Sequence, residues 1–380
     1  MKYVDEFRQR DLAQSLAAAI AREADESRRY SIMEFCGGHT HAIFRYGVQD
    51  LVPANLRFVH GPGCPVCVLP IGRIDGAMEL AEKHGVILAT YGDMMRVPAR
   101  KRRSLMKAKA EGADIRMVYS TQDALRIARD NPGREVVFFA IGFETTTPPT
   151  AVAIKQAQAE RLENFSVYCN HVLTPSAMRQ ILESPDGQET GGIAIDGFLG
   201  PSHVSTIIGT RPYAFVAKTY RRPIVITGFE PLDVLQATLM VVRQLNEGRH
   251  QVENQYLRVV TKDGNRKAQR LVAEVFELRP SFEWRGLGEI PDSALKIRDS
   301  FAAFDAERRF DLAARQIADI KSCACPAILR GIKKPTDCKL FGKTCTPENP
   351  MGSCMVSSEG ACAAYWTYRR SAEPAEEIAA

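Results

Sequence analysis

The feature that most constrains the fold is a repeated alternation of a short apolar strand, a polar turn and a helix along most of the 380 residues. The strands predicted in this pattern include 86–90, 114–120, 135–141 and 223–227. Strands that alternate with helices form mostly parallel sheets with helices on both faces. The sequence therefore predicts an α/β fold.

The length of the chain allows two compact domains and a small additional unit. An Asn-Pro-Gly turn at 131–133 marks the expected start of the second domain. We predict two doubly wound, mostly parallel-sheet domains at residues 1–130 and 131–300. A small C-terminal cysteine-rich domain at 301–380 follows, and a helix over 305–320 is expected to lead into it.

Six of the ten cysteines fall within forty residues near the C-terminal end. They are Cys323, Cys325, Cys338, Cys345, Cys354 and Cys362. A disulfide scaffold needs an oxidising compartment, and the charged stretch MKYVDEFRQR is unlike a signal peptide. Zinc favours paired C-x2-C spacings, which this segment lacks. Irregular spacing with intervening Gly and Pro is typical of a loop-wrapped [4Fe–4S] cluster, so we predict a small iron–sulfur domain with two cysteines left over as a candidate redox dithiol.

A further cysteine stands between a predicted strand, 31–35, and a helix, in the sequence Cys36-Gly-Gly-His-Thr-His. Unpaired backbone N–H groups and the positive end of the helix dipole are expected to lower the pKa of its thiol. We therefore expect Cys36 to be a nucleophile or a metal ligand; a buried structural cysteine beside a glycine turn is the alternative. The two glycines indicate a close backbone approach.

The next predicted strand, 56–60, ends in Gly-Pro-Gly-Cys64-Pro-Val-Cys67. A C-x2-C pair in such a turn acts as a redox couple or as a pair of soft metal ligands. The carboxyl ends of neighbouring parallel strands face one crevice, so we expect Cys64 and Cys67 to converge with Cys36. Three thiols there would suit a soft metal. Further groups at such a site could come from His39, His41 or His60, although His60 could simply bond its own turn.

Polar groups also follow later strands. The strand at 135–141 ends in Gly142-Phe-Glu-Thr-Thr-Thr, where Glu144, Thr145 and Thr146 could bind a small polar or anionic ligand with helix-start N–H groups. Ordinary N-capping explains one of the threonines. His203 is either functional or the neighbour of a helix N-cap. Cys169, inside a predicted strand, is expected in the core.

The formal net charge of +5, on 50 basic and 45 acidic residues, is mild. The densest basic cluster, 100–103, is expected to be a solvated helix start rather than a nucleic-acid surface. No apolar run approaches the ~20 residues that span a bilayer, and the common nucleotide-binding and serine-hydrolase motifs are missing. We expect a soluble, cytoplasmic protein that binds neither nucleic acid nor membrane, with frayed residues at 372–380.

Four of these motifs together closely resemble the HypD family of [NiFe]-hydrogenase maturation factors, over essentially the whole chain. They are the turns at Cys36, at Cys64 and Cys67, and at Gly142, and the segment from Cys338 to Cys362. The resemblance implies an assembly scaffold for the Fe(CN)2(CO) unit of the hydrogenase active site, redox-active rather than a stand-alone turnover enzyme. Its implied partners are a HypC-type chaperone, a HypE-type cyanide donor and, indirectly, the hydrogenase large subunit.

The resemblance also implies roles for single residues. Cys36 matches the cysteine that holds iron, and Cys64 with Cys67 matches a central dithiol. The tail matches a [4Fe–4S] domain similar to that of ferredoxin:thioredoxin reductase, which gives the cluster ligands as Cys323, Cys338, Cys345 and Cys362. Cys325 and Cys354 are then the redox pair. Electrons would run from the cluster through this pair to the central dithiol and on to iron.

Crevice residues are expected to bond the cyanide nitrogens or to contribute to the iron site; they are His39, Glu144, Thr145, Thr146 and His203. The competing interpretation is a cluster-dependent thiol/disulfide reductase that acts on a protein partner, which leaves Cys36-Gly-Gly-His unexplained. A zinc-stapled structural protein is a third, disfavoured by the cysteine spacings.

Overall fold

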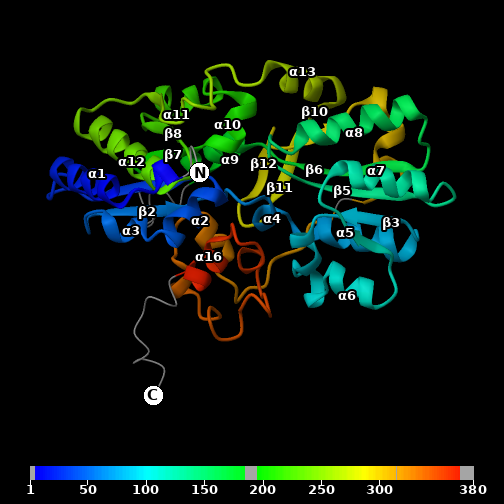
Figure 1. Cartoon of the computed structure of the whole chain (residues 1–380). Coiled ribbons are helices and arrows are strands. Elements are labelled where there is room, and N and C mark those ends of the chain that lie inside the picture. Colours follow the sequence, from blue (N-terminus) through cyan, green and yellow to red (C-terminus); the bar gives the residue numbers. More distant parts are fainter. Residues whose placement is uncertain (1–4, 185–194, 314, 369–380) are drawn as a thin grey trace.

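The structure is a computed structural model that describes residues 5–184, 195–313 and 315–368. Two parallel sheets form its centre (Figure 1). The first has the order β2-β1-β7-β8-β9, with β1 Tyr30–Glu34, β2 Leu56–His60, β7 Gly197–Pro201, β8 Ile224–Thr227 and β9 Val252–Asn254. The second has the order β4-β3-β5-β6, with β3 Ile87–Thr90, β4 Ile115–Met117, β5 Val136–Gly142 and β6 Phe165–His171. The predicted parallel α/β fold is thereby confirmed.

Helices cover the faces of both sheets. Those next to the first sheet include α1 Arg10–Glu23, α2 Gly37–Arg45, α3 Val48–Leu51, α10 Ser202–Ile208, α11 Ala214–Lys218 and α12 Pro231–Asn246. Those next to the second include α4 Pro65–Val68, α5 Ile71–Lys83, α6 Leu105–Ala110, α7 Thr121–Asp130, α8 Thr147–Glu160 and α13 Arg266–Val275. Helix α9, Thr174–Glu183, follows β6 but lies near α11, where Arg179 stacks on the Phe215 ring. Strand β5 is buried along its whole length, as its apolar run predicts for a strand covered on both faces.

The strand register brings the turns of interest to one edge of each sheet. Glu34 at the end of β1 pairs with His60 of β2 and with Leu199 of β7. The segments that follow these strands therefore lie side by side. In the second sheet Gly142, at the end of β5, pairs with His171 of β6, so the polar turn after β5 lies at the corresponding edge.

The division of the chain between the sheets differs from the division predicted at residues 130 and 131. Strands β1 and β2 belong with β7, β8 and β9, whereas β3 to β6 form the other sheet. The chain leaves the first sheet after β2, builds the second and then returns. The predicted boundary falls between α7 and β5, within the second sheet, because strand pairing is non-local and a turn in the sequence does not reveal it.

The C-terminal part packs against both sheets through small elements. Two hairpin-like pairs precede it, β10 Phe276–Leu278 with β13 Leu295–Ile297 and β11 Ser281–Trp284 with β12 Gly288–Pro291. The helix predicted over 305–320 is wrong: among the residues of this range that the structure describes, only Ala306–Arg309 form a helix, α14. Asp311, just beyond its end, has a left-handed φ of 47°, which a continuing helix does not allow. Within the described residues, no helix combines the length and apolarity that a bilayer span requires.

The cysteine-rich tail, residues 323–362, lies beside α2 and below the sheets in Figure 1. It contains α15 Cys325–Leu329 and a short 3₁₀ turn, Ser353–Met355, and it ends as α16, Ala361–Tyr368, begins. One buried cluster of side chains runs from both sheets into this tail, and it includes Cys64, Cys67 and Cys354. The thiols of the tail and of the C-x2-C turn therefore share one hydrophobic core.

Candidate functional site

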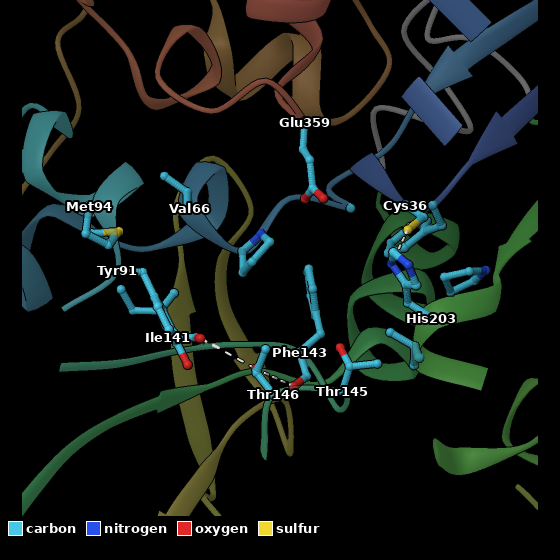
Figure 2. Close-up of a pocket in the computed structure, with 15 residues that line it drawn as sticks. Cys36, Val66, Tyr91, Met94, Ile141, Phe143, Thr145, Thr146, His203 and Glu359 are labelled. Atoms are coloured by element: carbon cyan, nitrogen blue, oxygen red, sulfur yellow. Dashed lines mark hydrogen bonds between the residues drawn. The ribbon is translucent and has the colours of Figure 1, made fainter. Parts of the chain in front are cut away.

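A cavity of about 300 Å³ lies between the two sheets, where their strand ends face each other (Figure 2). Residues that follow β1, β2 and β7 form one side of this crevice cavity, and residues that follow β3 and β5 form the other. Glu359 enters from the cysteine-rich tail. The three parts of the chain thus meet at one site.

Cys36 and His203 form the polar centre of this cavity. Cys36 is 7% exposed, and its Sγ lies 4.0 Å from Nδ1 of His203. The His203 ring packs on Phe229 with centroids 4.0 Å apart, which fixes the imidazole beside the thiol. A thiolate next to an imidazole is a donor pair that suits a transition metal such as iron.

The expected low pKa of Cys36 is wrong. Burial raises the pKa of this thiol, and the carboxyl groups of Glu359 and Glu34 raise it further. Hydrogen bonds from the N–H groups of Gly38 and His39, at the start of α2, oppose the change but are outweighed. Position at a helix start therefore does not decide the protonation of a buried thiol that has acidic neighbours.

Two carboxylates near Cys36, those of Glu34 and Glu359, were not predicted from the sequence. Glu34 is fully buried, and it accepts hydrogen bonds from the Cys36 N–H at 2.9 Å, from His60 Nδ1 at 2.9 Å and from the Thr40 hydroxyl. The available signal for it was a charged residue in a strand with no other charge. Glu359 projects into the cavity, and its pKa is raised by burial and then by Asp93 and Glu34. No local sequence signal points to Glu359, because only the return of the tail brings it there.

The close approach predicted at the glycines after Cys36 is confirmed. A Cβ on Gly37 would collide with Glu359, and a Cβ on Gly38 would lie 2.7 Å from the Phe229 ring. Gly63 allows the turn after β2 to pass directly over the backbone of Cys36. These glycines let the tail and two strand-end turns close around the thiol.

Several predicted residues lie elsewhere. Glu144 turns away from the cavity and accepts hydrogen bonds from the N–H and hydroxyl of Thr174, at 2.9 and 3.0 Å. His39 is buried with Nε2 2.9 Å from the Thr227 carbonyl. His41 lies near the Tyr368 hydroxyl, at 3.3 Å. Cys169 is confirmed as a core residue.

The two threonines after Glu144 do line the cavity, but they differ. The Thr146 hydroxyl donates to the carbonyl of Phe143 at 3.0 Å, so its proton is already engaged (Figure 2). Thr145 stands beside it and points into the cavity. Of the two, Thr145 is therefore the better placed to donate to a ligand.

The central dithiol faces the tail rather than the crevice cavity. The Sγ atoms of Cys64 and Cys67 are 2.6 Å apart, and both residues are buried. Cys67 is in contact with the thiol of Cys354, and the Ser353 hydroxyl donates to the Cys67 carbonyl at 2.8 Å. The three thiols expected to converge are thus divided, with Cys36 in the cavity and the pair behind it.

The tail thiols form a continuous group. The Cys325 thiol contacts those of Cys323, Cys354 and Cys362. Hydrogen bonds with Cys325 and Cys67 lower the pKa of Cys354. The sulfur of Cys345 accepts the Met351 N–H at 3.3 Å. Sulfur contacts therefore lead from the central dithiol through Cys354 into the tail.

The tail residues fit an iron–sulfur cluster by their chemistry. Within the described ranges, no three His, Cys, Asp or Glu side chains are already arranged as a metal site. The thiols nevertheless lie together in an apolar core, and a backbone N–H points at the sulfur of Cys345, as cluster ligands require. Gly352 leaves room beside them, since a Cβ there would lie 2.5 Å from the sulfurs of both Cys323 and Cys325. Cys338 is buried as well.

Comparison with known proteins gives a consistent result over the whole chain. The family model HypD, described as "Hydrogenase formation hypA family", matches residues 11–369. The chain is 65% identical over 370 residues to hydrogenase maturation factor HypD of Cupriavidus necator, which covers 97% of this chain and 98% of the relative. It is 64% identical over 379 residues to HypD of Azotobacter vinelandii, with 100% of each chain covered. It is 48% identical over 375 residues to HypD of Escherichia coli K12, with 97% and 99% covered.

Proposed function

Because the chain belongs to the HypD family of hydrogenase maturation factors, we propose that it is the scaffold on which an Fe(CN)2(CO) unit is assembled. Iron is the cargo, and Cys36 is its thiolate ligand. A HypC-type chaperone and a HypE-type cyanide donor act with the chain, and the hydrogenase large subunit receives the product. The chain works as a redox-active scaffold rather than as a stand-alone enzyme.

The observation that carries this proposal is a buried thiol beside an imidazole in a small cavity. Cys36 and His203 offer two donors to iron, and Phe35, Phe143 and Val66 are among the apolar groups around them. Exclusion of water by such walls protects bound cyanide and CO from exchange and strengthens each polar contact. The volume, about 300 Å³, suits an iron atom with diatomic ligands rather than a large substrate.

Iron binding releases the proton of the Cys36 thiol, and the cavity contains a group that can accept it. The Cys36 thiol must lose its proton when it binds iron, because only the thiolate is a ligand. Glu359 is the carboxylate that enters the cavity, and it is placed to take up that proton. Thr145 is placed to donate a hydrogen bond to a cyanide nitrogen.

The contact between Cys67 and Cys354 supports an electron route to the crevice. The Cys354 thiolate attacks a Cys64–Cys67 disulfide at Cys67, which gives a Cys67–Cys354 disulfide and frees Cys64. Cys325 then attacks Cys354 and frees Cys67, so the central pair gains two electrons and two protons while a Cys325–Cys354 disulfide forms. A [4Fe–4S] cluster, held by Cys323, Cys338, Cys345 and Cys362, would supply single electrons to reduce that disulfide. The reduced central pair would then supply electrons to the iron held at Cys36.

Infrared spectroscopy of the anaerobically purified complex with the chaperone tests the proposal. Wild-type protein should show the stretching bands of metal-bound CO and cyanide, and Cys36→Ala should lack them. Cys169→Ser is the matched control, because Cys169 is a buried thiol in the core away from the crevice cavity, and its bands should persist. Absence of bands from the wild type, together with thiol reductase activity, would favour the cluster-dependent reductase instead.

A further inference from the structure

A strongly basic surface borders the cysteine-rich tail. Residues 96–109, here called the cationic loop, contain seven Lys and Arg and no Asp or Glu, in a chain whose net charge is only +5. They span a 3₁₀ turn, Arg100–Arg102, and most of α6, whose N-cap is Ser104. The scaffold function uses none of these side chains.

Neighbouring carboxylates neutralise only part of this charge. Arg103 pairs with Glu82 and Glu111, and Arg100 lies 3.4 Å from Asp75. The remaining exposed cations of the loop have no ion pair with a carboxylate among the described residues; they are Lys101, Arg102, Lys107 and Lys109. Met106, which is 49% exposed, adds an apolar contact point among them. The surface thus attracts negative charge and offers a small apolar spot.

The backbone of the cationic loop is strained at two of its exposed cations. Lys101 and Arg102 have φ values of 54° and 58°, a left-handed conformation that favours glycine. Glycine would relieve the strain and remove the charge. A strained backbone that carries long charged side chains is typical of a functional position.

The cationic loop also lies directly on the segments that carry tail thiols. Arg102 donates to the Asn349 side chain at 2.8 Å, and Asn349 donates to the carbonyl of Thr344, the neighbour of Cys345, at 2.9 Å.

Arg96 makes a second link to the same region. Its guanidinium donates to the carbonyls of Pro347 and Val356, at 2.9 and 3.2 Å. These residues follow Cys345 and Cys354 by two positions each. A molecule bound at the loop would therefore sit next to the thiols of the tail.

We propose that the cationic loop is the docking surface for an acidic one-electron carrier protein that reduces the tail cluster. The inference rests on the proposed function, in which the tail holds a [4Fe–4S] cluster. In the step itself the reduced carrier loses one electron and the oxidised cluster gains it, with no bond made or broken and no proton moved. Complementary charge speeds such encounters and orients them without requiring a large interface.

Reduction of the cluster by flavodoxin, an acidic flavin carrier, tests this surface. Reduced flavodoxin is mixed anaerobically with the full chain, and the second-order rate constant of cluster reduction is followed at several ionic strengths. Lys101→Glu combined with Lys107→Glu should slow the reaction about tenfold at low salt and abolish its salt dependence. Both side chains are exposed, and among the described residues neither has a hydrogen bond or an ion pair to the tail. Lys107→Glu does give up the hydrogen bond from Lys107 Nζ to the Arg102 carbonyl, so Lys101→Glu alone is measured beside the double variant.

The matched control reverses the same charge elsewhere. Lys262→Glu with Lys267→Glu alters two exposed lysines, one shortly before α13 and one within it, and should leave the rate unchanged. Helix α13 lies on the far side of the molecule from the tail (Figure 1). Reduction by a neutral photogenerated deazaflavin radical should be equal in all forms.

The outcomes separate the two proposals. Equal flavodoxin rates in wild type and the cationic-loop variant would overturn the docking surface and leave the cluster intact. A wild-type chain without a reducible cluster, shown by electron paramagnetic resonance, would overturn the proposed function and this inference together. If the loop variant kept its flavodoxin rate but lost affinity for a DNA duplex, a nucleic-acid surface would replace the carrier surface.

Discussion

One thiol of the crevice cavity and one of the cysteine-rich tail, Cys36 and Cys354, lie in opposite surroundings. In the cavity a single thiol, Cys36, is buried beside the carboxyl groups of Glu359 and Glu34, and its pKa is raised. In the tail Cys354 lies among other thiols, and hydrogen bonds with Cys325 and Cys67 lower its pKa. A thiol that keeps its proton until a metal displaces it suits capture of cargo, whereas a stabilised thiolate suits thiol–disulfide exchange. The two regions therefore divide binding from redox chemistry.

The largest predicted effect comes from filling the space beside the tail sulfurs. Gly352→Ala should abolish cluster binding, because the new Cβ would lie 2.5 Å from the sulfurs of Cys323 and Cys325. Iron and acid-labile sulfide content, with the visible absorbance of the purified chain, measure the loss. The crevice should be unaffected, so Cys36 should keep the alkylation rate of the wild type.

Gly133→Ala is the control for that change. Its Cβ would meet no atom within 4 Å, and it should retain a full complement of iron and sulfide. Undiminished cluster content in Gly352→Ala would show that Cys323 and Cys325 do not lie beside a cluster.

The buried carboxyl group of Glu144, in the turn after β5, should make the free energy of unfolding depend on pH. Burial raises the pKa of Glu144 to about 7, although Thr174 donates two hydrogen bonds to it. The folded state thus holds this proton more tightly than the unfolded state, where the pKa is near 4.3. The resulting stabilisation is complete below the unfolded pKa and is lost as pH rises through about 7, with a total of roughly 4 kcal/mol.

Glu144→Gln should remove that dependence. The amide does not ionise in this pH range, and its oxygen can still accept a hydrogen bond from the Thr174 N–H. Urea unfolding at pH 5 and pH 8 should show the variant gaining about 3 kcal/mol relative to wild type at the higher pH. Parallel unfolding curves for the two proteins at both pH values would contradict a raised pKa for Glu144.

Sequence reasoning predicted the strand ends well and the contacts across the fold poorly. The apolar runs at 56–60 and 135–141 are close to β2 and β5, because buried strands carry a local signal. The grouping of strands into sheets was not predictable in the same way, since β1 pairs with β7 across more than 160 residues. No turn or composition shift encodes such a pairing.

The same distinction applies to the site. Cys36 and His203 were identified because each follows a strand, and strand ends meet at one crevice. Glu359 was missed because a distant segment delivers it, and Glu144 was misplaced because a strand end does not say which way a side chain turns. Residue type and spacing identified the candidates, whereas tertiary contacts decided which of them face the cavity.

A smaller effect should follow from removing the carboxylate that the tail contributes to the cavity. Glu359→Gln should lower the pKa of Cys36, because the ionised carboxyl group opposes a second negative charge beside it. Alkylation of Cys36 by iodoacetamide, followed by peptide mass spectrometry between pH 8 and 10, should become roughly three- to tenfold faster. Glu359→Asp keeps the charge and should resemble the wild type. An unchanged rate in Glu359→Gln would mean that the Glu359 carboxylate does not affect the pKa of Cys36. The difference between Cys36 and Cys354 would then not depend on this charge.

The smallest predicted effect separates the two threonines of the crevice. Thr146 already donates to the Phe143 carbonyl, whereas Thr145 points into the cavity, so a cyanide bound to iron at Cys36 should accept a hydrogen bond from Thr145 alone. Thr145→Val preserves the shape of the side chain and removes that donor, which should shift a cyanide stretching band of the loaded protein without loss of iron. Thr146→Val should leave the bands at the same wavenumbers, because the hydroxyl that it removes donates to the Phe143 carbonyl and not to the cargo. A shift in Thr146→Val and none in Thr145→Val would reverse the assignment, and it would require the turn after β5 to rotate when the cargo binds.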